Sequence, residues 1–136
     1  MTMKGNPVDT EFGSGLQVGD FFFLSAVDAC GEAGEPVGVD SRERILFCMK
    51  KIQDVLLSAG GNLESLVQLR FYCSDSSPLT AQDIREVLAE LIEEPLPALS
   101  VIPSGRIPGE LMADGIAVIL NSTAGCGGCK GCGGVC

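Results

Sequence analysis

Apolar and polar residues alternate along several short stretches of the chain, a pattern that predicts β-strands whose two faces have different surroundings. These stretches are residues 16–18, 21–26, 66–73, 98–102 and 113–120. Gly19-Asp20 separates the first two, which is typical of a tight hairpin turn. A longer connection that contains proline and glycine separates the last two. The pattern therefore predicts a hairpin near the amino terminus, followed later by three separate strands.

Two longer segments place apolar residues three and four positions apart, the spacing of an amphipathic helix. The stripe of the first segment consists of Ile45, Met49, Ile52, Leu56 and Ala59. We expect Asp40 to cap the start of this helix, with Glu43 as its partner three residues later. Gly60-Gly61 is expected to end it, because glycine adopts the left-handed conformation of a helix C-cap at little cost.

The second helical segment has a single apolar face made of Ile84, Val87, Leu88, Leu91 and Ile92. Thr80 is expected to cap it with Asp83 at the third position, and Pro95 and Pro97 are expected to stop it. The resulting order of elements is β-β-α-β-α-β-β. We therefore expect an α+β, two-layer domain in which two helices pack on one mixed sheet.

Length, composition and charge narrow the classes of function. The chain has 136 residues, which is enough for one domain. Its net charge of -9 argues against nucleic-acid binding, because phosphate contacts need clustered cations. The absence of histidine excludes Ser-His-Asp and Cys-His catalysis and His-ligated metals. Because no apolar run could span a membrane and no signal-peptide pattern is present, we expect a cytoplasmic protein.

The cysteines fall into two groups. Cys30, Cys48 and Cys73 lie in apolar or strand-like segments, where we expect small packing residues or inert thiols. The others are Cys126, Cys129, Cys132 and Cys136, in a segment that is rich in glycine and almost without apolar surface. We therefore divide the chain into a folded body, residues 1–120, and an appended flexible tail, residues 121–136.

The spacing of the last four cysteines is C-x2-C-x2-C-x3-C, the run by which bacterial ferredoxins hold iron–sulfur clusters. The same spacing suits tetrahedral Zn²⁺. Three interpretations of the tail are open. It could bind a soft metal, a metalloid or a cluster; it could carry sulfur or selenium as a persulfide-type adduct; or it could itself be a substrate, as in the precursor of a modified peptide. A partner enzyme would receive the cargo or modify the tail.

Short segments across residues 14–120 resemble the RidA/YjgF family, also called the L-PSP endoribonuclease family. The matching segments are Phe23-Leu24-Ser25, residues 55–60, residues 62–67, Cys73-Ser74-Asp75, residues 97–100 and Arg106-Ile107-Pro108. Their order and spacing carry the resemblance. It implies a chorismate-mutase-like fold and a homotrimer with ligand clefts between subunits. It also implies hydrolysis of reactive enamines or imines to 2-oxo acids and ammonia.

The chain departs from the family at the position that the resemblance makes most important. The family's Pro-Ala-Arg-Ser segment supplies an arginine that holds the substrate carboxylate, and here that position is Leu99. A guanidinium offers a carboxylate two parallel hydrogen bonds, whereas leucine offers none. Two residues later, a frequent cysteine is replaced by Val101, and Ser100 between them is unchanged. Standard 2-imino-acid deamination is therefore not expected.

Other cleft positions have also changed. The acidic residue of the last strand aligns with Asp114, which we expect either to serve the cleft, to pair with an arginine or to be exposed at a sheet edge. Lys51 stands where the first helix of the family often has asparagine. Arg106 or Arg85 could supply the missing positive charge from elsewhere. The cleft candidates are Ser25, Leu99, Ser100, Arg106 and Asp114, although Ser25 and Ser100 could equally be strand-end hydroxyls.

These observations favour a trimeric scaffold whose tail thiols bind or carry a soft metal, an iron–sulfur cluster or a sulfur or selenium species for a partner. The body itself requires no cofactor. The alternative is a RidA-type deaminase or hydrolase that acts on an enamine, an imine or another small molecule in the cleft between subunits. A third interpretation is the precursor of a modified cysteine-rich peptide.

Overall fold

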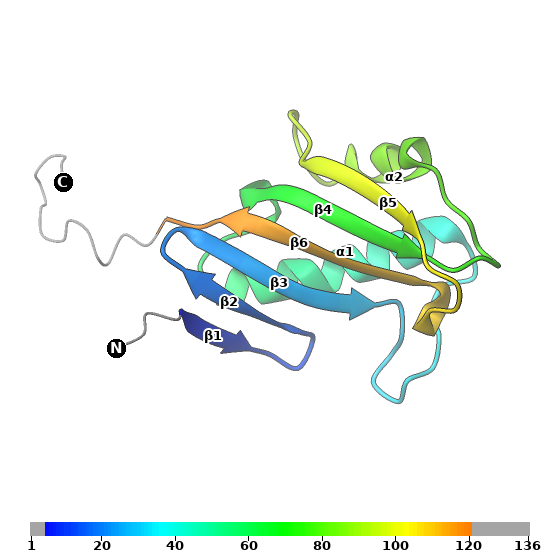
Figure 1. The fold of residues 1–136 in the computed structure, drawn as a ribbon, viewed down its shortest axis with the longest axis horizontal. Coiled ribbons are helices and arrows are strands. Elements are labelled where there is room, and N and C mark those ends of the chain that lie inside the picture. Colours follow the sequence, from blue (N-terminus) through cyan, green and yellow to red (C-terminus); the bar gives the residue numbers. More distant parts are fainter. Residues whose placement is uncertain (1–4, 121–136) are drawn as a thin grey trace, which may run out of the picture.

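A computed structural model describes residues 5–120, which form one six-stranded sheet and two helices (Figure 1). The strands are β1 (Asn6–Asp9), β2 (Ser14–Val18), β3 (Phe21–Asp28), β4 (Leu66–Cys73), β5 (Ala98–Pro103) and β6 (Leu111–Val118). The helices are α1 (Ser41–Ser58) and α2 (Ala81–Leu88), and single 3-10 turns cover Leu63–Ser65 and Pro108–Glu110. The expected order is confirmed, apart from an additional first strand.

The sheet is mixed, with the strand order β1-β2-β3-β6-β4-β5. β4 and β5 are parallel, and every other neighbouring pair is antiparallel. The helix α2 lies in the connection between the two parallel strands, as parallel pairing requires a long crossover. The prediction of two helices on one mixed sheet is thus confirmed.

The predicted turns and caps explain why these elements begin where they do. Gly19 has a φ of +61° in the β2–β3 hairpin, a value that glycine adopts without a steric penalty. The side chain of Asp40 accepts a hydrogen bond from the backbone N–H of Glu43 and caps α1. Thr80 and Asp83 form the reciprocal capping box of α2.

Several elements differ from the sequence prediction. β2 begins two residues earlier than expected, β3 continues two residues further, and β5 ends one residue later. β1 was not predicted, because Asn6–Asp9 contains a proline and two polar residues and shows no strand pattern. It forms a strand through antiparallel pairing with β2. α2 ends at Leu88 rather than continuing through Ile92, and turn-type hydrogen bonds carry the chain onward while Ile92 stays buried. β6 spans Leu111–Val118, two residues earlier than predicted at each end.

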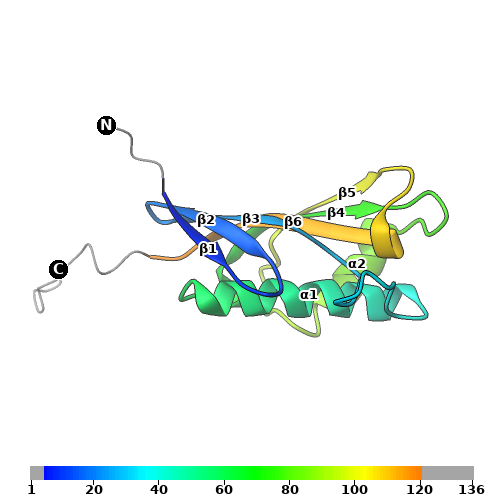
Figure 2. The ribbon, with the colours of Figure 1, turned by 90° about the horizontal axis from the view of Figure 1, so that it is seen from below.

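The core lies between the sheet and the helices, which cover one face of the sheet (Figure 2). Alternate residues of β3 and β6 point into it, and Phe22, Leu69 and Phe71 are completely buried. Gly115 on β6 leaves room for β4, since a Cβ atom there would lie 2.3 Å from the backbone oxygen of Gln68. The helices therefore pack on a surface that strand alternation defines.

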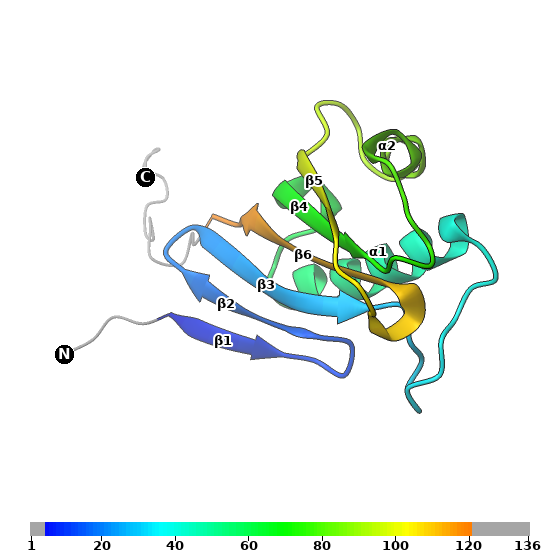
Figure 3. The ribbon, with the colours of Figure 1, turned by 45° about the vertical axis from the view of Figure 1, so that its right-hand side comes forward.

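No helix of residues 5–120 covers the opposite face, as Figures 2 and 3 show. We call it the open face. It exposes the aromatic rings of Phe21 and Phe23, which are 52% and 43% accessible, and Val18 lies beside them on β2. In the described residues, no helix is both long enough and apolar enough to cross a membrane.

Candidate functional site

A polar cluster lies at the centre of the open face. Asp114 of β6 is the register partner of Arg70 on β4. The Nε of Arg70 donates to Oδ1 of Asp114 at 2.9 Å, and its Nη2 donates to Oδ2 at 3.1 Å. The hydroxyl of Tyr72 donates to the same Oδ2 at 3.1 Å. Of the expected roles of Asp114, the structure thus shows the pairing with an arginine. Asp114 does not lie at a sheet edge, because β6 is an inner strand.

Two members of this cluster, Arg70 and Tyr72, have raised pKa values. The side chain of Asp114 is 15% exposed, whereas that of Arg70 is 47% exposed. Burial raises the pKa of Tyr72 above its ordinary value, and the hydrogen bond to Asp114 and the negative charge of Asp114 raise it further. The hydrogen bond to Asp114 also raises the pKa of Arg70. The cluster thus consists of a salt bridge and a neutral phenol.

Serine hydroxyls extend the polar cluster across neighbouring strands. Ser100 on β5 is the parallel register partner of Arg70. On the other side, Ser25 of β3 lies within the bulge between Leu24 and Val27, where β3 pairs with β6 around Asp114. The hydroxyl of Ser14 on β2 donates to that of Ser25 at 3.1 Å. Three of the sequence candidates, Ser25, Ser100 and Asp114, therefore share one face of the sheet.

Leu99 and Val101 lie on the other face of β5. Leu99 is the register partner of the buried Leu69, and both Leu99 and Val101 pack against the core. Val101 also lines a small cavity of about 220 Å³ together with Leu79 and Pro103. At the position where the family resemblance places a carboxylate-binding arginine, this chain therefore presents apolar surface.

The arginines considered from the sequence lie elsewhere. Arg106 is exposed in the loop after β5, and Arg85 is exposed on α2, on the side of the helices. The arginine that meets Asp114 is Arg70, which the sequence analysis did not single out. Two features of the sequence point to Arg70. It is the polar residue between the core residues Leu69 and Phe71 of a predicted strand. The carboxylate of Asp114 also needs a partner, because it lies on an otherwise apolar strand.

Lys51 connects α1 to the end of β3 through hydrogen bonds of its ammonium group. Its ammonium group donates to the backbone oxygens of Asp28 and Cys30, both at 2.9 Å, and to Oδ1 of Asp28 at 3.1 Å. It also lies 5.1 Å from the centre of the Phe47 ring. Because an ammonium group has three protons, these bonds use all of them and fix the end of β3 to α1.

The three body cysteines are buried and free. Burial raises the pKa of each thiol, in the case of Cys48 to about 12. They are therefore neutral, poorly reactive thiols, as the sequence predicted. Within residues 5–120, no group of three or more acidic or cysteine side chains could hold a metal ion. The candidate ligands Cys126, Cys129, Cys132 and Cys136 lie outside the described residues.

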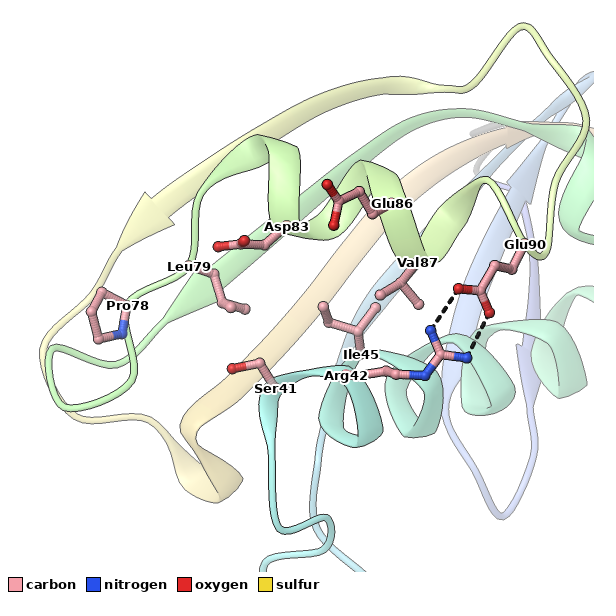
Figure 4. Close-up of a pocket in the computed structure, with 9 residues that line it drawn as sticks. All are labelled: Ser41, Arg42, Ile45, Pro78, Leu79, Asp83, Glu86, Val87 and Glu90. Atoms are coloured by element: carbon pink, nitrogen blue, oxygen red, sulfur yellow. Dashed lines mark hydrogen bonds and ion pairs between the residues drawn. The ribbon is translucent and has the colours of Figure 1, made fainter.

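A groove of about 360 Å³ runs between α1 and α2 (Figure 4). The guanidinium of Arg42 and the carboxylate of Glu90 face each other there and form two hydrogen bonds of 2.6 Å. Asp83 is held in the capping box of α2, and Glu86 accepts a hydrogen bond from Gln82. The charged groups of this groove are thus engaged in contacts within and between the helices and are less available to a ligand.

Comparison with known proteins identifies relatives of this chain in sequence. No family model matches the chain. It is 27% identical over 97 residues to protein mmf2, mitochondrial, of Schizosaccharomyces pombe, covering 71% of this chain and 75% of that protein. It is also 25% identical over 104 residues to a RutC family protein of Pyrococcus abyssi, covering 76% of this chain and 80% of that one.

Solved structures agree with these matches. RidA from the Antarctic bacterium Psychrobacter sp. PAMC 21119 superposes with a TM-score of 0.69 at 18% identity, over 82% of this chain and 98% of that chain. The Rid family protein YyfA of Yersinia pestis superposes with a TM-score of 0.71 at 16% identity, over 84% and 100%. The described body therefore has the architecture of these proteins.

Proposed function

We propose, because this chain belongs to the RidA/YjgF family, that its body forms a homotrimeric scaffold for the four thiols of residues 126–136. These thiols bind a soft metal, an iron–sulfur cluster or a sulfur or selenium species and deliver it to a partner. Thiolate is the ligand that such soft centres prefer. The assembly acts in the cytoplasm, where thiols remain reduced.

The contrast between the two groups of cysteines carries this proposal. The thiols of Cys30, Cys48 and Cys73 are buried and have raised pKa values, so they are protonated at neutral pH and closed to a ligand. The closely spaced cysteines of the carboxy-terminal segment carry no such restriction in their sequence, which is polar and rich in glycine. Any thiol chemistry of the protein is therefore assigned to that segment.

The open face supports the proposed assembly. Phe21 and Phe23 are large apolar side chains on a face that lacks helices, and removing such surface from water favours association. A chain of this length also gains core by associating with copies of itself. Sedimentation of the full-length protein is expected to give three subunits, and a stable monomer would argue against the scaffold.

Elemental and sulfur analysis of the anaerobically purified native protein tests the carrier function. Replacing Cys126, Cys129, Cys132 and Cys136 with serine is expected to abolish bound metal, selenium or labile sulfur while leaving the trimer intact. The matched control replaces Cys30, Cys48 and Cys73 with alanine; it is expected to lower stability and to spare binding. If the tail variant retains its full content, the proposed function is wrong.

A second candidate function is hydrolysis of an uncharged enamine or imine in a cleft between subunits. The small cavity beside Val101 favours it, since Leu79, Val101 and Pro103 offer a substrate packing surface and no cation that could bind a carboxylate lines the cavity. Turnover of 2-imino acids is expected to stay near background. Leu99→Arg then asks whether a restored guanidinium is enough for activity, and family-level turnover by the unaltered protein would contradict the expectation.

A further inference from the structure

A further cavity lies where β4 and β5 end, and none of its lining residues belongs to the cluster of Arg70, Tyr72 and Asp114. It adjoins the cavity beside Val101, because Ser74 and Asp75 line both. The loops of residues 74–77 and 104–107 and the turn of Pro108–Glu110 surround about 490 Å³. The carboxyl ends of parallel strands are a common position for ligand sites, because the loops that follow them converge there. Ser74 is four residues beyond Arg70 on β4, about 13 Å along an extended strand.

The walls of this cavity are tied to one another by the backbone. The N–H of Asp75 donates to the carbonyl of Gly105 at 2.8 Å, and that of Ser104 donates to Cys73 at 2.9 Å. The N–H of Ser74 donates to the carbonyl of Glu110 at 3.2 Å. The loop that follows β4 is thus held at several points to the continuous segment 104–110 that follows β5. A preformed cavity costs a ligand less ordering entropy on binding.

Glu110 brings a fixed negative charge into the cavity. Its Oε1 accepts a hydrogen bond from Oγ of Ser76 at 2.6 Å and another from the hydroxyl of Ser74, a residue that is 3% exposed. These bonds, that from Ser74 first, lower the pKa of the carboxyl group, and the positive charge of Arg44 lowers it further. A carboxylate with a lowered pKa is a poor general base, so Glu110 suits binding of a positive charge better than proton transfer.

Arg106 brings a positive charge into the same cavity. It lines the cavity with Asp75 and Glu110, yet within residues 5–120 its guanidinium forms no ion pair or side-chain hydrogen bond with either carboxylate. By contrast, Arg42, Arg70 and Lys51 each form an ion pair with a carboxylate. The cavity therefore presents opposite charges that do not neutralise each other by direct contact.

We propose that this cavity binds a small zwitterion, a molecule that carries both an ammonium group and a carboxylate. Its carboxylate contacts the guanidinium of Arg106, and its ammonium group contacts the carboxylates of Glu110 and Asp75. The guanidinium offers a carboxylate paired donors, and a carboxylate acceptor strengthens hydrogen bonds from an ammonium group. Neither the carrier function nor a cleft at Leu99 is needed for this site.

Titration of the full-length, isotopically labelled protein by amide NMR tests the proposal. The probes are glycine, β-alanine and γ-aminobutyrate, which differ in the separation of their charges, with acetate and methylammonium as singly charged controls. We expect at least one zwitterion to shift the amides of Gly105, Arg106 and Glu110 and to bind at least about tenfold more tightly than either control.

Substitutions then assign the two charges. Arg106→Gln and Glu110→Gln are each expected to weaken zwitterion binding about tenfold to hundredfold, whereas Arg85→Gln, on exposed α2, leaves it unchanged. Arg106 is exposed, so its replacement keeps the test valid even if Glu110→Gln disturbs the fold. The proposal is overturned if no zwitterion binds more tightly than acetate and methylammonium, if Arg106→Gln binds as the unaltered chain does, or if the shifts centre on Ser25 and Asp114.

Discussion

The two faces of the sheet are built from alternate residues of the same strands, yet they have different roles. On β3, Phe22 is completely buried beneath the helices, while its neighbour Phe23 is 43% exposed on the open face. On β6, the buried Ala113 and Gly115 flank Asp114, which turns to the open face and pairs with Arg70. One strand thus contributes at once to the hydrophobic core and to a polar cluster.

This difference shows that the alternation of apolar and polar residues explains the covered face of each strand but not the residues on its open face. The covered face follows the hydrophobic effect, so its apolar residues need no specific partner. The open face combines aromatic rings with a salt bridge, and a fully solvated face needs neither. This composition suits the association between copies of the chain that we propose, in which apolar contact is combined with a pair of charges.

The largest expected difference in stability is between alanine variants of two adjacent residues, Phe22 and Phe23. Phe22→Ala is expected to lower the free energy of unfolding by about 3–5 kcal/mol, because it removes a fully buried ring and leaves a cavity. Phe23→Ala is expected to cost less than about 1.5 kcal/mol within a subunit, because the ring is already half in water. Urea denaturation of both variants measures the difference.

Measuring the urea midpoints of both variants at several protein concentrations separates an effect on the subunit from an effect on association. If the open face joins copies of the chain, Phe23→Ala makes the urea midpoint depend more strongly on concentration and weakens the oligomer in sedimentation. Phe22→Ala changes the midpoint to the same extent at every concentration. Equal losses for the two variants in dilute solution would contradict the assignment of the two faces.

Exchanging the charges of Arg70 and Asp114 is expected to have the next largest effect, and it tests the polar cluster. Arg70→Asp places a second carboxylate opposite Asp114, and Asp114→Arg places a second guanidinium opposite Arg70; each is expected to lower the thermal midpoint through repulsion across the strands. Combining the two substitutions restores opposite charges and is expected to recover part of the loss. The double-mutant cycle isolates this pairwise coupling. Additive losses would mean that the salt bridge contributes nothing specific.

Most of the fold was accessible from the sequence because its signals are local. The alternation of residues 66–73 coincides with β4, and the cap residues Asp40 and Thr80 lie where the helices begin. β1 was not accessible, since Asn6–Asp9 becomes a strand only by pairing with β2. The end of α2 was not accessible either, because Leu91 and Ile92 fit a helical stripe although the backbone leaves the helix at Leu88.

The site was accessible only in part, because it depends on register. The sequence identified Asp114 and its need for a partner, but the partner arginine is 44 residues away and is chosen by the pairing of β6 with β4. Similarly, the cavity of Glu110 and Arg106 joins loops that follow different strands. No spacing rule along the chain predicts which of several arginines such contacts select.

The smallest effect can be measured directly, because Tyr72 is the one tyrosine of the chain and tryptophan is absent. The pKa of Tyr72 lies above its ordinary value of 10.0, raised first by burial and then by the hydrogen bond to Asp114 and its negative charge. The folded state therefore favours the neutral phenol. This contribution to stability is complete below the pKa of an unfolded tyrosine and is lost as the pH rises through the folded pKa.

Ultraviolet titration of the phenol is the final test of the open face. Asp114→Asn removes the charged acceptor, so the pKa of Tyr72 should fall toward its ordinary value, with the part caused by burial remaining. Arg70→Gln removes a cation that lowers this pKa, so it should produce a smaller shift upward. Glu90→Gln is the matched control, because that carboxylate pairs with Arg42 in the groove between α1 and α2 and should leave Tyr72 unaffected. Shifts of opposite sign from the two members of one salt bridge would tie the phenol to that pair, and an unchanged titration in Asp114→Asn would show that burial alone governs it.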